Sequence, residues 1–196
     1  MLINRILRFV HASISPQERR SFMKQKILLL TCGTGEGHNS AASAVAEALG
    51  AQGVETVRRD PISFAGEKAK KAVSGVYNQI IKKTPKMFGA IYKAGKAVDR
   101  VRFQSPVYYA NTVYAKKLAA YILDEKFDAV VCTHLFAMEA LTYIKKCGLL
   151  TVPSYGVLTD YTCIPFFEET RLDEYFIPHA DLTAELCAKG MEKERL

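Results

Sequence analysis

The glycine-rich stretch from Gly33 to His38 is the part of the sequence best suited to chemistry. Its glycines Gly33, Gly35 and Gly37 let the backbone approach a ligand closely and leave amides free for an anion or a hydroxyl-rich group. The His38 imidazole titrates near neutrality and could accept a proton from an attacking hydroxyl. The stretch is not the dinucleotide pattern GxGxxG, and no Gly-Lys-Ser/Thr follows as in a P-loop. We interpret it as a ligand-facing turn, with a turn that only serves packing as the alternative.

Polar residues also follow three later apolar runs. Thr133 and His134 follow one run, Thr159 and Asp160 the next, and His179 the last. Ligands of open parallel sheets bind beyond the carboxyl ends of the strands, so we expect these residues along one rim. Asp160 is the alternative candidate for the base. It could instead orient a base or an acceptor. His134 and His179 also fit hydrogen-bonded histidines without a catalytic duty.

The sequence gives no sign of a metal site or a bound cofactor. Spacings such as HxxxH are absent, so we expect no metal. The five cysteines form no CxxC pair, and no cleavable signal peptide precedes them, which indicates reduced cytosolic thiols. Cys32 and Cys132 end apolar runs and are expected in the core.

Apolar patterning predicts an α/β fold. A strand, a helix with apolar residues at 42, 45, 46 and 49, and a second strand make a βαβ unit, and strands and helices alternate again later in the chain. This alternation predicts a Rossmann-like, mostly parallel sheet with helices on both faces. The expected strands are 27–30, 54–57, 128–132, 152–158 and 175–177, with later helices at 106–124 and 136–146.

A helical insert is predicted at about residues 64–125, and it contains the basic region of the protein. Between Glu67 and Arg102 ten basic residues face two acidic ones, whereas the whole chain has a net charge of +7. We expect an anionic partner surface, lipid headgroups or nucleic acid, with a solvated helix face as the alternative. The residues expected to contact membrane and anionic lipid are Lys82, Lys83, Lys86, Lys93, Lys96, Phe88 and Tyr92.

Residues 1–25 form an amphipathic basic leader. It could lie on a membrane as an interfacial helix, or be translated from a start upstream of the true one, since Met23 directly precedes the first strand segment. No apolar run approaches the roughly 20 residues of a spanning helix, so any membrane contact is expected to be peripheral.

Three stretches resemble one enzyme family. They are residues 26–49 (KILLLTCGTGEGHNSAASAVAEAL), 128–141 (DAVVCTHLFAMEAL) and 155–182 (YGVLTDYTCIPFFEETRLDEYFIPHADL). The first resembles the N-terminal strand, glycine-rich turn and helix of the monogalactosyldiacylglycerol synthase and processive diacylglycerol glucosyltransferase group. The others are similar to that family's THPF and VTD segments, so the resemblance covers about residues 26–190 in order.

This resemblance implies the first half of a GT-B glycosyltransferase, whose two Rossmann-like halves bind the acceptor and the nucleotide-sugar. It implies inverting transfer of a hexose from a UDP-sugar to a diacylglycerol-type lipid, without a required metal. The insert would hold the acceptor lipid and the anionic membrane, so the expected location is cytoplasmic, peripheral to the inner face of the plasma membrane. Carried over by position, the catalytic candidates are His38 and Asp160, and the acceptor side of the cleft comprises Gly33, Gly35, Gly37, Thr133, His134 and Thr159.

Two departures from the family pattern qualify this hypothesis. Where many relatives have His and Trp in the VTD segment, this chain has Ile164 and Phe167, so any role of that histidine is lost or moved. The chain also ends at Leu196, where the donor-binding half is expected to begin, and residues 191–196 would start the linker to it. The alternatives are a non-catalytic peripheral membrane-binding module with the same fold and, less favoured for want of base-stacking or groove-reading elements, a nucleic-acid-binding protein.

Overall fold

A five-stranded parallel sheet organises the protein. The computed structural model describes residues 25–33, 36–66 and 104–196. The strands pair in the order β2-β1-β3-β4-β5, and every pairing is parallel. The predicted parallel α/β fold is therefore confirmed. The strand bounds are β1 Lys26–Leu30, β2 Glu55–Arg59, β3 Ala129–Cys132, β4 Ser154–Val157 and β5 Glu174–Phe176.

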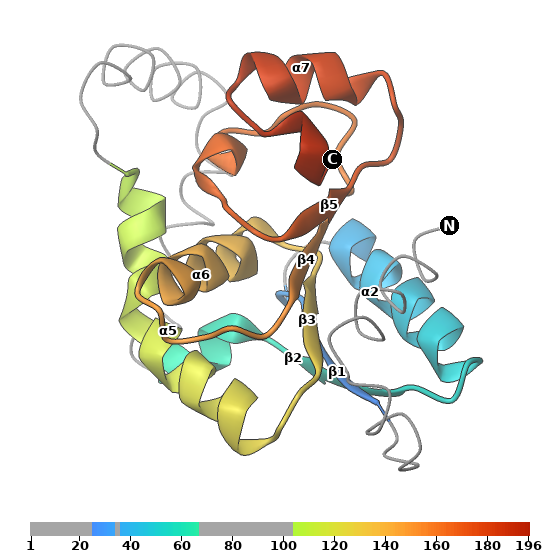
Figure 1. The fold of residues 1–196 in the computed structure, drawn as a ribbon, viewed down its shortest axis with the longest axis vertical. Coiled ribbons are helices and arrows are strands. Elements are labelled where there is room, and N and C mark those ends of the chain that lie inside the picture. Colours follow the sequence, from blue (N-terminus) through green and yellow to red (C-terminus); the bar gives the residue numbers. More distant parts are fainter. Residues whose placement is uncertain (1–24, 34–35, 67–103) are drawn as a thin grey trace.

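Helices cover both faces of this sheet (Figure 1). Alternate residues of β1 face opposite sides: Ile27 and Leu29 pack in one buried cluster with Val45 and Leu49 of α2, while Leu28 joins the larger cluster formed with α5 and α6. The helix bounds are α2 Glu36–Gly50, α5 Pro106–Asp124, α6 Leu135–Lys146 and α7 Leu182–Ala188, with short 3₁₀ helices at Pro61–Ala65, Phe167–Glu169 and Lys193–Arg195.

Helix α5 confirms the last helix predicted for the insert. The Ser105 hydroxyl accepts a hydrogen bond from the Tyr108 amide, and Pro106 occupies the first turn, where a missing N–H costs nothing. None of the helices in the described ranges is long and apolar enough to cross a membrane. The leader and the predicted helices around residues 73–81 and 87–92 lie outside the described residues.

A buried polar network joins α5 to α6. Asn111 donates from Nδ2 to a carboxyl oxygen of Glu139 at 2.6 Å, and Tyr114 donates toward Asn111 Oδ1 at 2.5 Å. Burial raises the pKa of Glu139 well above its usual range. The network fixes how α6, whose N-terminus borders β3, sits against α5.

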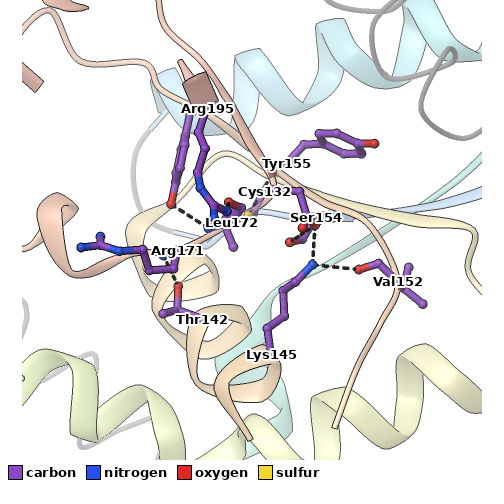
Figure 2. A network of polar contacts seen from close by, with 11 residues as sticks. Cys132, Thr142, Lys145, Val152, Ser154, Tyr155, Arg171, Leu172 and Arg195 are labelled. Atoms are coloured by element: carbon purple, nitrogen blue, oxygen red, sulfur yellow. Dashed lines mark hydrogen bonds and ion pairs between the residues drawn. The ribbon is translucent and has the colours of Figure 1, made fainter. Parts of the chain in front are cut away.

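A second polar network ties α6 to the amino ends of β4 and β5 (Figure 2). Asp173 Oδ2 accepts from the Ser154 amide at 2.7 Å and forms an ion pair with Lys145. Lys145 also donates to the Val152 carbonyl, and the Arg171 amide donates to the Thr142 hydroxyl at 2.8 Å. The amino end of the sheet is therefore held by side-chain bonds to backbone groups.

Candidate functional site

His38 lies at the carboxyl edge of the sheet, where it meets a residue from a distant strand. It occupies the first turn of α2 and is half-buried. Its Nδ1 lies 2.9 Å from the hydroxyl of Thr159, 121 residues further along the chain, just after β4. Because Nδ1 is engaged in this bond, Nε2 is the ring nitrogen left for a ligand.

His134 packs beside His38 but is buried. The two rings lie 4.7 Å apart between centroids at an interplanar angle of 71°, and His134 makes a similar edge contact with Phe136. His134 caps α6, since its Nδ1 accepts from the Phe136 amide at 3.2 Å. Burial, and secondly the charge of His38, lowers the pKa of His134 to about 3, so this imidazole stays neutral near pH 7.

The glycine turn is anchored by a residue that the sequence reasoning missed. Asp60, at the carboxyl end of β2, accepts from the Gly33 amide at 3.3 Å and from the Ile62 amide at 2.9 Å. A signal was available, because Asp60 lies three residues after the predicted strand 54–57 and directly precedes Pro61. Among the described residues, a Cβ at Gly37 would meet nothing within 4 Å. Gly35 lies outside the described residues.

The remaining predicted rim residues differ in exposure. Thr133 is buried, and its hydroxyl has no hydrogen-bond partner within the described ranges. Asp160 is half-buried, and the same part of the chain offers its carboxylate no hydrogen bond. His179 is exposed, and its Nδ1 lies 3.1 Å from the Asp181 carboxylate; within the described ranges no hydrogen bond or ring contact joins it to His38. The structure thus brings His38, Thr159 and His134 together, while the ligand contacts of the predicted residues stay predictions.

The described residues contain no group of three or more His, Cys, Asp or Glu side chains placed to hold a metal ion. Cys32 and Cys132 are buried, as predicted, and desolvation raises the pKa of both thiols. Within the described residues, this edge offers the half-buried imidazole of His38 beside the Thr159 hydroxyl, with the carboxylate of Asp160 next along the chain. That set suits the handling of a hydroxyl proton.

Comparison with known proteins assigns the family. The family model for monogalactosyldiacylglycerol (MGDG) synthase matches residues 38–196. The chain belongs to the MGDG synthase family.

Individual relatives agree with this assignment. A processive diacylglycerol beta-glucosyltransferase of Bacillus cytotoxicus is 25% identical over 183 residues, which cover 87% of this chain and 43% of that protein. A protein of the same name from Bacillus mycoides is 26% identical over 87% of this chain and 43% of that protein. Another from Bacillus cereus is 26% identical over 78% of this chain and 38% of that protein. The chain therefore spans less than half the length of these relatives.

The two residues that replace the family's His and Trp in the VTD segment, Ile164 and Phe167, lie in or against the core. Phe167 is buried and Ile164 packs partly buried against the same cluster. Both apolar side chains belong to the segment that connects β4 to β5 and contribute to the core. The seven predicted membrane-contacting residues lie outside the described residues.

Proposed function

We propose that this chain is the acceptor-binding half of an inverting glycosyltransferase that moves a hexose from a UDP-sugar to a diacylglycerol-type lipid. Membership of the MGDG synthase family supports the reaction class. The observation that carries the assignment to this site is the hydrogen bond between Thr159 and His38, which unites two predicted rim segments at the edge where parallel sheets bind ligands.

His38 is the proposed general base. When its Nδ1–H donates to the Thr159 hydroxyl, Nε2 keeps a lone pair and can take the proton of the acceptor hydroxyl. The acceptor oxygen then bonds to the anomeric carbon as the bond from that carbon to UDP breaks, with inversion. The neighbouring His134 remains neutral because of its lowered pKa, so it does not oppose the positive charge that His38 acquires.

Asp160 follows Thr159 directly and is the second proposed catalytic residue. Its carboxylate can accept a hydrogen bond from an acceptor hydroxyl and orient it toward His38. Gly33, Gly35 and Gly37 are proposed to line the cleft, with Thr133 and His134 as its more buried members. We assign the donor phosphates mainly to a C-terminal domain or subunit, since the chain aligns with less than half of each relative.

A transfer assay tests the catalytic proposal. The chain alone, and the chain fused to the remaining part of the B. cytotoxicus relative, are incubated with UDP-glucose or UDP-galactose and diacylglycerol vesicles. We expect β-linked glycolipid from the fusion and none from the chain alone. Robust transfer by the chain alone would contradict the proposal that a separate half binds the donor. An α-linked product would contradict an inverting mechanism.

We further propose that the basic segment binds an anionic membrane surface. Each lysine close to such a surface contributes roughly 1 kcal/mol to binding. Reversing Lys82 and Lys83 to Glu should therefore weaken sedimentation with phosphatidylserine vesicles at least about tenfold. The matched control reverses Lys116 and Lys117, an exposed pair on α5. Equal loss in both variants would contradict a specific segment, and vesicle binding by a fusion that never transfers sugar would favour the non-catalytic module.

A further inference from the structure

The loop after β4 is held to the fold at two points. At its start, the Thr159 hydroxyl bonds His38. Four residues later, Cys163 is buried, with 3% of its surface exposed. Asp160 and Tyr161 lie between these points, and neither makes a hydrogen bond within the described ranges. Their position therefore depends on how the two ends of the loop are fixed.

Glu185 of α7 and Lys189, the residue that caps the C-terminus of this helix, fix the second point. Glu185 Oε1 accepts from the Thr162 hydroxyl at 2.8 Å and from the Cys163 amide at 3.0 Å. Lys189 Nζ donates to the Cys163 carbonyl at 2.8 Å. Both backbone polar groups of Cys163 are thus satisfied by side chains one helical turn apart on the same face. We name Glu185 and Lys189 the α7 clamp.

The clamp favours the charged form of Glu185. The hydrogen bonds from Thr162 and then from the Cys163 amide lower its pKa, so it is ionised near neutral pH. Hydrogen bonds to a charged acceptor are stronger than neutral ones, so the carboxylate is a firm anchor for the loop.

Tyr161 is the residue of the tethered loop best suited to contact a ligand. It is 77% exposed, the highest value among the large hydrophobic side chains of the described residues. An aromatic ring with a hydroxyl suits a ligand that has both apolar and hydroxyl-bearing parts. The backbone that carries this ring is tethered at both ends, which reduces the backbone entropy lost on binding.

We propose that Glu185 and Lys189 are positioning residues that hold Asp160 and Tyr161 against the acceptor lipid, with Tyr161 as a contact to its glycerol and first acyl carbons. This inference rests on the proposed function, because it assumes that the acceptor binds at the His38 edge. It adds Tyr161 as a residue that binds the acceptor, and Glu185 and Lys189 as residues that position the loop. Neither of the two positioning residues was among the predicted site residues.

The test combines amide exchange with an NMR titration by water-soluble dihexanoylglycerol. In Glu185→Ala, exchange of the Cys163 amide, which loses its acceptor, should accelerate about tenfold or more, and affinity should fall about tenfold. Glu185→Gln keeps an acceptor oxygen and should restore most of both properties. Tyr161→Ala should weaken affinity similarly without changing exchange at Cys163. The control Glu47→Ala, on the exposed face of α2, should match wild type.

The outcomes separate the two proposals. Wild-type exchange and affinity in Glu185→Ala would overturn the clamp while leaving the proposed function intact. Faster exchange with unchanged affinity would overturn its role toward the acceptor, and unchanged affinity in Tyr161→Ala would remove that contact. If Glu185→Ala fails to fold, Lys189→Met supplies the same readouts. A wild-type chain that does not bind dihexanoylglycerol would overturn both the acceptor proposal and this inference.

Discussion

At the amino ends of β3 and β5, carboxylates accept hydrogen bonds from backbone amides, whereas beyond the carboxyl ends of β1 and β4 the side chains of His38 and Asp160 keep unused hydrogen-bonding capacity. Asp128, before β3, accepts from the Lys26 amide at 2.8 Å, and Asp173, before β5, accepts from the Ser154 amide at 2.7 Å. At the opposite edge, Asp160 has no hydrogen bond within the described ranges, and His38 bonds a hydroxyl through only one nitrogen.

This difference indicates that residues at the amino ends of the strands mainly stabilise the fold, whereas residues at the carboxyl ends are available for function. Side chains that satisfy backbone groups contribute to folding, because an unpaired buried amide is costly. Side chains with unused hydrogen-bonding capacity contribute little to folding and are available to a ligand. Substitutions at the two ends should therefore have opposite signatures, one in unfolding and the other in binding and turnover.

The largest expected effect is at the carboxyl end. Replacing His38 by Ala in the fusion enzyme should lower the transfer rate about 10²- to 10⁴-fold, because the base for the acceptor hydroxyl is removed. The unfolding midpoint should change little, since His38 is only half-buried. His179→Ala is the matched control, because His179 lies on the same edge but contacts Asp181. Equal losses in both variants would contradict a specific role of His38.

His134 should make stability depend on pH. Its folded-state pKa, about 3, is lower than the ordinary value of about 6.5, so the unfolded chain binds a proton that the folded chain does not. Stability is therefore fully present above about pH 6.5 and should fall by about 1.4 kcal/mol per pH unit as the pH drops toward 3.

His134→Asn keeps a side chain that can cap α6 and should remove most of this pH dependence. Urea unfolding of both proteins between pH 4.5 and 7.5 measures the difference. Parallel pH profiles for wild type and variant would show that His134 is not the buried neutral group described above.

At the amino end, Asp173→Ala should lower the free energy of unfolding by about 2 kcal/mol, because the Ser154 amide and Lys145 lose their shared acceptor. Dihexanoylglycerol affinity should be unchanged. The control Asp124→Ala removes an exposed carboxylate at the end of α5. Weaker acceptor binding by folded Asp173→Ala protein would break the division between the two ends.

The smallest effect is expected at the exposed ion pair of Lys26 and Glu125, whose nitrogen and oxygen lie 2.6 Å apart. Exposed pairs contribute little, since water and salt screen them and two long side chains must be ordered. Glu125→Gln should be indistinguishable from wild type in urea unfolding at physiological salt. A clear loss of stability would mean that the amino end depends on this pair as well.

Much of the fold could be predicted from the sequence because apolar runs mark buried parallel strands directly. The rim was also predictable, since chain direction in a parallel sheet sends Thr133, Thr159 and the glycine turn to one edge. The hydrogen-bond partners of individual side chains could not be predicted. Asp60 bonding Gly33, or Glu185 and Lys189 bonding Cys163, depends on contacts between distant segments that no local pattern encodes.

The burial of individual side chains also could not be predicted from the sequence pattern. His38 and His134 look alike in sequence, each following an apolar strand. The structure leaves one half-exposed and buries the other as a helix cap, because the α6 amide of Phe136 needs an acceptor. The exposure of each imidazole is therefore set by tertiary packing, which the local sequence does not show.

The most direct test of this account is an NMR map of dihexanoylglycerol binding on the wild-type chain, with labelled amides and histidine side chains. We expect saturable shifts at His38, Thr159 and Asp160, with Lys145 and Ser154 at the amino end unmoved. Saturable shifts confined to the amino end, or no binding at all, would contradict an acceptor site at the carboxyl edge of the sheet.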